Sequence, residues 1–461
     1  MVLVLDFFVP RRYKSALGYV TVIGLLLVLP SVFMAGNRAP SFGGTVIADQ
    51  FSAFFNAIYI IAAVFTILIS MDYLKKVGAE RGEYYYIILF ATLGMMVMTS
   101  SNDLINVYVG LELMALSFYV LVAFRTDCRR SSEGALKYFI LGALSSGILL
   151  YGISFAYGVT GTTNILEIAE LASDIPASEP FLLLAIAFMA VGFAFKIALF
   201  PFHIWAPDAY EGAPTPVTAL LSVGSKAAAF AIFMRIFIVA FPAFRPQWAK
   251  MLWGLSAATM LFGSVVAISQ DKIIRMLAYS SITHAGIILI GLLSFNNLGI
   301  SGIMYYLLVY TFMNMGAFAV ATMYMRGDGK GELISDYRGL YKRHPWLAFL
   351  MALFLLSLAG IPPTGGFTAK FFILASAVNA GYYVLAALGV LATVISLVFY
   401  VKVIFYMYMK EPEEEEEETG PSASFLYYIV LFVTAVGTLF LGIYPTPFME
   451  MAVEAIRPLL I

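Results

Sequence analysis

Four ionisable residues stand deep inside long apolar stretches of the sequence: Glu112, Lys196, Lys226 and Lys370. A charge at the centre of a membrane helix costs about 2.5–3.5 kcal/mol on insertion scales, so such residues usually face a bundle interior or a wet cavity and pair with one another. Burial disfavours the charged form of either group, whereas a nearby opposite charge favours it. A Lys–Glu pair whose separation changes can therefore gain or lose a proton near neutral pH, and this residue set predicts proton transfer.

Two histidines lie close to these charges in the sequence. His203, in PFHIW, and His284, in YSSITHAG, add imidazoles of the kind that titrates near pH 6.5. The hydroxyls that flank His284 could hold water. The alternative for each is an imidazole that only packs in the core, and the sequence leaves that alternative open.

The other two cations in the apolar stretches are Arg235 and Lys402, which lie closer to the ends of their predicted helices. Long basic side chains near a helix end extend along the helix until the charge reaches the membrane surface. We expect this arrangement for both residues. For Glu112 and Lys226 it is disfavoured, because apolar residues extend far on either side of them.

Two of the stretches that carry a buried lysine are interrupted. Four prolines break the run around Lys196 (GFAFKIALFPFHIWAPDAYEGAPTP), and a PPTGG segment breaks the run that leads to Lys370. Proline removes a helical backbone hydrogen bond, and at membrane depth the freed carbonyls are tolerated only against protein or water. Two broken segments in corresponding positions of two halves are typical of an inverted-repeat transporter.

Composition indicates which elements position these residues. Of the 461 residues, 61% are apolar and 12% are charged, with a mean hydropathy of +0.90. Soluble domains average about 45–50% apolar and about 25% charged residues, so a soluble fold is excluded. A spanning helix needs about 20 mostly apolar residues, and thirteen stretches qualify: 16–35, 51–71, 84–99, 104–124, 134–158, 181–200, 216–240, 248–269, 273–293, 299–325, 346–378, 382–409 and 423–444.

The predicted fold is therefore an all-α, polytopic membrane bundle of about 14 helices. In that count Met1–Val9 is the end of a truncated first helix, because this segment is too short to span a bilayer. Five stretches form a block at 84–240, broken near 196–215, and five more form a block at 245–410, broken near 360–370. The odd number of crossings per block would invert the second copy. Residues 1–83 form peripheral N-terminal helices, 411–422 form an acidic loop, and 423–461 form a C-terminal helix and tail.

Basic residues predict the orientation, because cytoplasmic loops of membrane proteins are rich in Lys and Arg. The four on one side are Arg38, Arg245, Lys250 and Arg457. The eighteen on the other are Arg11, Arg12, Lys14, Lys75, Lys76, Arg81, Arg125, Arg129, Arg130, Lys137, Lys272, Arg275, Arg326, Lys330, Arg338, Lys342, Arg343 and Lys410. The second set is assigned to the cytoplasm, which places both termini outside and the acidic run Glu411–Glu418 in a cytoplasmic loop.

Several function classes are excluded. Cys128 is the single cysteine, so this chain alone cannot hold an iron–sulfur cluster or a four-cysteine zinc site. No GxxxxGK[ST] phosphate-binding loop occurs. A net charge of −1 gives no basic surface for nucleic acid. The energy for any transport must therefore come from partners.

Five motifs point to a known family: VGFAFKIALFPFHIWAPDAYEGAPTPVTALLSVGSKAAAF, VYVGLELMALSFYVLVAF, SSEGALKYFILGALSSG, ISQDKIIRMLAYSSITHAGI and LSLAGIPPTGGFTAKF. Together they resemble the proton-translocating core of the antiporter-like membrane subunits of respiratory complex I, NADH–quinone oxidoreductase, and the likeness covers essentially the whole chain. Within that family, the GAP-P-V…SK pattern from Gly212 to Lys226 and the lysine at 370 favour the N type, the counterpart of mitochondrial subunit 2, over the L and M types.

The resemblance implies a role for each matching residue. Glu112 and Lys196 match a charged pair near the first half-channel, Lys226 matches the central lysine, and Lys370 matches the terminal lysine that leads to the outside. His203 matches a relay histidine beside the first break. Lys137, in EGALKYF, matches another implicated lysine, although its place near a helix start leaves open a merely solvated side chain.

The resemblance also implies a function and partners. The chain would be a proton-translocating subunit of the cell inner membrane, without a redox cofactor or metal of its own. NADH, FMN, iron–sulfur clusters and quinone would sit in partner subunits. Those partners would include subunit M and small helical membrane subunits. The same charged residues would also serve a multisubunit Na⁺/H⁺ antiporter or a related hydrogenase or dehydrogenase complex.

Overall fold

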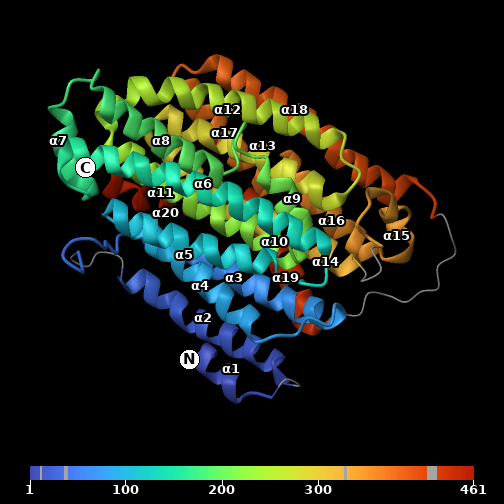
Figure 1. Ribbon diagram of the computed structural model, residues 1–461. Coiled ribbons are helices and arrows are strands. Elements are labelled where there is room, and N and C mark those ends of the chain that lie inside the picture. Colours follow the sequence, from blue (N-terminus) through green and yellow to red (C-terminus); the bar gives the residue numbers. More distant parts are fainter. Residues whose placement is uncertain (11–12, 36–39, 326–329, 413–422, 461) are drawn as a thin grey trace.

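The computed structural model describes the chain except residues 11–12, 36–39, 326–329, 413–422 and 461. Its described part consists of helices joined by short connections (Figure 1). Most of the predicted acidic loop at 411–422 lies outside the described residues. So do four of the basic loop residues: Arg11, Arg12, Arg38 and Arg326.

The N-terminal helices form one edge of the bundle and part of its interior. Helices α1 (Val2–Phe8) and α2 (Ser15–Ala35) lie at the lower edge in Figure 1, and α2 leaves many apolar side chains exposed. Helix α3 (Gln50–Lys76) is buried along nearly all of its length. Asp49 is the N-cap of α3, because its carboxylate accepts a hydrogen bond from the Ser52 backbone N–H at 2.7 Å.

The first predicted block contains five membrane crossings, of which the fourth is interrupted. Helix α8 ends at Lys196, and the chain then turns through Ala198, whose φ of 58° is left-handed, before the short α9. The fifth crossing carries two π-helical segments, η2 directly before Lys226 and η3 directly after Arg235. The elements are α4 (Glu83–Thr99), α5 (Leu104–Val122), α6 (Arg129–Thr160), α7 (Ile165–Ser173), α8 (Pro180–Lys196), α9 (Trp205–Gly212), α10 (Thr215–Leu220), η2 (Leu221–Ser225), α11 (Lys226–Arg235) and η3 (Ile236–Ala240).

The second block repeats this order of long and interrupted crossings. Helix α16 ends at Ala359, the next residue, Gly360, has a φ of 89°, and α17 begins at Gly365. The elements are α12 (Arg245–Ile268), α13 (Ile273–Ser294), α14 (Asn297–Tyr324), α15 (Leu340–Arg343), α16 (Pro345–Ala359), α17 (Gly365–Asn379) and α18 (Tyr383–Met409). Helices α19 (Phe425–Ile443) and α20 (Thr446–Ala455) follow.

The predicted all-helical membrane bundle is confirmed. Ten helices in the described residues are long and apolar enough to cross a membrane, and three shorter apolar helices, α4, α8 and α16, complete the thirteen predicted crossings. Of these three shorter helices, α8 and α16 belong to the interrupted crossings, whereas α4 is short without an interruption. The division into domains and the inverted relation of the two blocks stay predictions.

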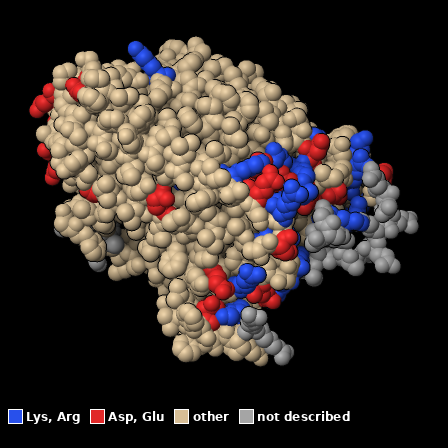
Figure 2. All heavy atoms as spheres, in the orientation of Figure 1, with Lys and Arg blue, Asp and Glu red and all other residues tan. Residues whose placement is uncertain are grey.

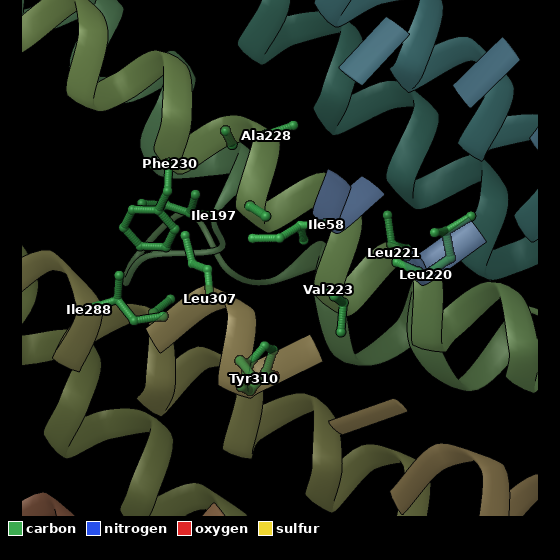
Figure 3. Packing of buried hydrophobic residues seen from close by; sticks show 14 of the residues in the cluster. Ile58, Ile197, Leu220, Leu221, Val223, Ala228, Phe230, Ile288, Leu307 and Tyr310 are labelled. Carbon is green, nitrogen blue, oxygen red and sulfur yellow. The ribbon is translucent and has the colours of Figure 1, made fainter. Parts of the chain in front are cut away.

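Burial differs sharply between inner and outer helices. The apolar windows of α3, α10–η3, α13 and α14 are at least 89% buried, whereas those of α2, α6 and α18 are below 40%. Figure 3 shows the tight apolar packing at the centre, where α3, the break after α8, α10–α11, α13 and α14 meet. The labelled side chains include Ile58, Ile197, Leu221, Phe230, Ile288 and Leu307. The inner helices therefore form the layer in which a buried charge is shielded from lipid.

Charged side chains gather at one end of the molecule. Figure 2 shows Lys, Arg, Asp and Glu concentrated near α9 and α15, beside a broad belt without charges. We call this the basic end. It contains Lys75, Lys76, Arg125, Lys272 and Lys342. The uncharged belt is what lipid contact requires.

Candidate functional site

Lys226 is buried at the start of α11, immediately after the π-helical turn η2. Its side chain is 2% exposed, and Nζ donates a hydrogen bond to the Ser281 carbonyl of α13 at 2.6 Å and also contacts the Ser281 hydroxyl. π-Helical turns inside α-helices are rare and frequently mark functional sites. Here the turn directly precedes Lys226, whose side chain reaches from α11 to α13.

His284 lies one turn beyond Ser281 on α13 and is held at both ring nitrogens. Nδ1 is 2.6 Å from the Tyr306 hydroxyl of α14, and Nε2 is 3.2 Å from the Tyr400 hydroxyl of α18. The ring is 2% exposed, and it lies within electrostatic range of both Lys226 and Lys370. A neutral imidazole donates from one nitrogen and accepts at the other, so this arrangement can pass a proton through the ring.

Lys370 is buried at the second break. It belongs to α17, yet its Nζ donates hydrogen bonds to the carbonyls of Leu358 and Ala359 at 2.8 and 3.0 Å. These carbonyls belong to the last turn of α16, where carbonyl groups accept no hydrogen bond from their own helix. The negative end of the α16 dipole also favours a cation at this place. The interruption of the crossing thus creates the binding site for the lysine.

Lys196 occupies the end of α8 and is 3% exposed. Its Nζ is 5.9 Å from the ring centroids of Tyr119 and Phe195 and has no hydrogen-bond partner in the described part of the chain. Glu112, on α5, interacts with it electrostatically, although the described residues show no ion pair between them within 4.0 Å. The structure thus brings the two predicted partners close without direct contact.

His203 lies in the connection between α8 and α9. Its ring packs against the rings of Phe200 and Phe262, with centroids 5.6 and 4.7 Å away, and those two rings are 4.9 Å from each other. The imidazole is 6% exposed, and Nδ1 has no hydrogen-bond partner among the described residues. The imidazole thus belongs to a cluster of three rings, and its buried Nδ1 is available to a hydrogen-bond partner.

Lys137 is placed differently from the other predicted residues. Its side chain is 46% exposed, and Nζ is 2.9 Å from carboxylate oxygens of both Glu133 and Asp208. It belongs to an ionic cluster at the basic end, which also contains Arg275, Glu211 and Lys272 with contacts of 2.6–2.8 Å. The structure therefore groups Lys137 with surface charges rather than with the buried lysines.

The ionic cluster lowers the pKa values of its two carboxyl groups, Asp208 and Glu211. Burial raises the pKa of Asp208, but hydrogen bonds from Arg275 and Lys137 outweigh burial and hold that pKa below its ordinary value. The pKa of Glu211 is lowered in the same way, against burial, by hydrogen bonds from Lys272 and Arg275. Both carboxylates are thus held ionised at neutral pH.

The two cations expected near the membrane surface take different positions. Lys402 matches the expectation: its Nζ is 3.1 Å from the Gln270 carbonyl and 3.3 Å from the exposed Asp271 carboxylate. Arg235 is instead 4% exposed and forms a buried ion pair with Asp49 at 2.8 Å, with Phe51 stacked 5.1 Å from its guanidinium. A buried partner from α3, far away in the sequence, replaces the expected contact with water.

Sequence reasoning missed several residues that complete the site. The Ser280 and Ser281 hydroxyls were noted beside His284, but Tyr306 and Tyr400 gave no signal in a chain with 15% aromatic residues. Asp49 was missed because it precedes an apolar stretch instead of interrupting one. Within the described residues, no three His, Cys, Asp or Glu side chains are grouped so as to hold a metal ion.

Comparison with known proteins decides the family. A profile of the family described as NADH:quinone oxidoreductase/Mrp antiporter, TM, matches residues 101–396. NADH-quinone oxidoreductase subunit N of Trichlorobacter lovleyi is 45% identical over 460 residues, which span 99% of this chain and 93% of the relative. The chain belongs to this subunit N family.

Solved structures support the same assignment. A chain of respiratory complex I from Thermus thermophilus is 31% identical, with a TM-score of 0.82 over 98% of this chain and 97% of that chain. A chain of the membrane-bound sulfane sulfur reductase, an archaeal respiratory membrane complex, is 26% identical, with a TM-score of 0.86 over 100% and 94%. The subunit N family thus places the chain in the membrane arm of an oxidoreductase complex, as a multi-pass membrane protein.

Proposed function

We propose that this chain translocates protons across the cell inner membrane as a subunit of a NADH–quinone oxidoreductase. The route follows four buried groups, Glu112, Lys196, Lys226 and Lys370. The relay groups are His203, His284 and, on the entry side, Lys137. The basic end faces the cytoplasm, as the distribution of Lys and Arg favours.

The single observation that carries this proposal is the arrangement on α13 between two buried lysines. Ser281 accepts from Lys226, and His284, one turn away, lies within electrostatic range of Lys226 and Lys370. Buried ionisable residues in membrane helices commonly line proton relays. Both lysines also sit beside a helix irregularity, where backbone carbonyls can accept hydrogen bonds from water in place of protein donors.

Energy for the transport comes from partner subunits in this proposal. NADH, FMN, iron–sulfur clusters and quinone are bound there, and electron transfer to quinone is coupled through the membrane arm. Subunit M and small helical membrane subunits are the proposed neighbours. In this chain, that energy would change the distances between the buried ionisable groups, and these changes would drive proton transfer.

The test uses Glu112→Gln, Lys226→Ala and Lys370→Ala, each introduced into the assembled complex. Inverted vesicles are assayed for NADH oxidation and proton uptake, and we expect the number of protons taken up per NADH to fall in all three. Lys402→Ala is the matched control, because its Nζ contacts the Gln270 carbonyl and the exposed Asp271 carboxylate and lies outside the proposed buried route. Normal proton uptake by all three variants in an assembled complex would contradict the proposal.

A second candidate is a subunit of a multisubunit Na⁺/H⁺ antiporter, which the family description also includes. The same buried lysines would then respond to an ion gradient. The vesicles used above discriminate the two: proton movement that follows added Na⁺ without NADH favours the antiporter. Proton uptake that requires NADH and quinone favours the oxidoreductase.

A further inference from the structure

Four buried polar atoms between α5, α6 and α8 have no hydrogen-bond partner in the described residues. They are Glu112 Oε1, the Tyr119 hydroxyl, Ser146 Oγ and Lys196 Nζ. The exposed fractions of Tyr119, Ser146 and Lys196 are 7%, 3% and 3%. Buried polar groups in proteins nearly always have a partner, either from the protein or from ordered water.

Helix packing places the Tyr119 hydroxyl against one point of α6. A Cβ atom added to Gly142 would lie 2.0 Å from this hydroxyl oxygen, so the phenol reaches α6 at Gly142. Any side chain larger than hydrogen at position 142 would displace it. Ser146 follows Gly142 by one helical turn, on the same face of α6.

The adjacent face of α6, which carries Ser145 and Leu149, packs against α8. A Cβ atom on Gly192 would lie 2.7 Å from Cβ of Leu149, and the Ser145 hydroxyl is 3.4 Å from the Gly192 carbonyl. Because α6 and α8 run in opposite directions, Lys196, one turn after Gly192, is level with Ser145 and Ser146. Lys196 Nζ also lies 5.9 Å from the Tyr119 ring centroid.

Glu112 completes the arrangement from α5, two turns before Tyr119 on the same helix. It interacts electrostatically with both Lys196 and Tyr119. Lys196 and Glu112 form no direct hydrogen bond. The hydroxyls of Tyr119 on α5 and Ser146 on α6 can each donate and accept a hydrogen bond. Water needs two to four polar partners to occupy a buried site, and these atoms supply them.

We propose that Tyr119 and Ser146 hold a short file of ordered water between Glu112 and Lys196, with the Tyr119 hydroxyl seated against Gly142. The inference rests on the proposed function and adds the groups that join the first two charges of the route. A proton leaving the Glu112 carboxyl enters the file, and another proton leaves the far end to the Lys196 amine. Each intervening oxygen gains one proton and gives one up, so the hydroxyls return to their starting state.

The test removes the two hydroxyls while conserving the shape of the side chains. In the assembled complex, the double variant Tyr119→Phe/Ser146→Ala should lower the protons taken up per NADH to the level of Glu112→Gln. Ser146→Thr, which retains a hydroxyl, should restore the ratio when Tyr119 is present. Tyr84→Phe and Ser396→Ala are the matched controls, because their hydroxyls bind Ser70 and the Ala392 carbonyl at 2.7 Å, on helices other than α5, α6 and α8.

The outcomes separate this inference from the proposed function. A normal ratio in the double variant, with a reduced ratio in Glu112→Gln, overturns the water file and leaves the proposed function standing. A normal ratio in both would contradict the proposed function itself. The water file is then judged directly, by a density map of the complex that resolves water in the membrane arm. Water bonded to the Tyr119 and Ser146 hydroxyls, and its loss in Gly142→Ala, supports the inference, whereas its absence beside resolved water elsewhere overturns it.

Discussion

The three buried lysines are held in three different ways. Lys370 binds terminal carbonyls of α16, Lys226 binds one residue of the continuous helix α13, and Lys196 has no acceptor in the described part of the protein. Hydrogen bonds to a charged group favour its charged form. In the proposed route the three lysines are therefore unequal, because the number of their acceptors differs.

The ion pair of Arg235 and Asp49 is expected to contribute strongly to stability. Arg235→Ala leaves the Asp49 carboxylate buried without its partner, and breaking a buried pair in this way costs about 3–5 kcal/mol. Thermal unfolding of the purified complex checks this loss. Lys402→Ala, which breaks an exposed pair, should cost at most about 1 kcal/mol. Equal losses of stability in the two variants would show that the buried ion pair stabilises the protein no more than the exposed pair does.

At the residue scale, the sequence was informative about charges and silent about their partners. Glu112, Lys196, Lys226 and Lys370 could be found because a charge interrupts an apolar run. The partners are carbonyls, serines and tyrosines, which are common in membrane helices and carry no such contrast. Only the packing of α13 against α14 and α18 brings Tyr306 and Tyr400 to His284.

At the scale of elements, the interrupted helix α16–α17 depends on close backbone contact. A Cβ atom on Gly366 would lie 1.8 Å from the Ser357 carbonyl oxygen. Gly366→Ala should therefore push α17 away from α16, destabilise the subunit by about 1–3 kcal/mol and lower proton uptake through the displacement of Lys370. Gly147→Ala is the control, because a Cβ there meets nothing within 4 Å. Wild-type assembly and uptake in Gly366→Ala would contradict this account of the break.

The ionic cluster at the basic end predicts a pH-dependent stability. Because the Asp208 pKa is lowered on folding from its ordinary value of 3.8, its contribution is fully present above that value and is lost as the pH falls toward the lower folded pKa. Asp208→Asn should cost about 1–2 kcal/mol at pH 7, between the values for an exposed ion pair and a buried charged hydrogen bond. Unfolding temperatures of wild type and variant, measured from pH 7 downward, should converge below about pH 4. A difference that stays constant with pH would exclude the ionised carboxylate as the source.

The sequence predicted the breaks at the scale of elements but not what they bind. The prolines and glycines near 201–216 and 360–366 mark where the crossings are interrupted. The direction of the freed carbonyls depends on how α16 and α17 pack, and this is why Lys370 could be placed near the break but not on the α16 terminus. The π-helical turns on either side of α11 left no pattern in the sequence at all.

For the whole molecule, the inner layer of helices connects the two blocks into one structure. Helix α13 contacts α14, α17 and α18, and α14 also packs against α3 and α10. His284 on α13 faces charges that come from both blocks, Lys226 from the first and Lys370 from the second. His284 is thus the group through which the charges of the two blocks influence one another, as the proposed transport in series requires.

Transport in series makes a prediction that independent routes do not share. If protons pass Lys226 and then Lys370, and if the more severe single substitution closes the route, the double variant Lys226→Ala/Lys370→Ala should lose no more proton uptake per NADH than that single variant. Two independent routes would give losses that add, because each lysine would then serve its own protons. Inverted vesicles containing the wild type, the two single variants and the double variant provide the comparison. A double variant that falls clearly below both singles would show that each block carries protons separately, and that the contacts of His284 do not join them.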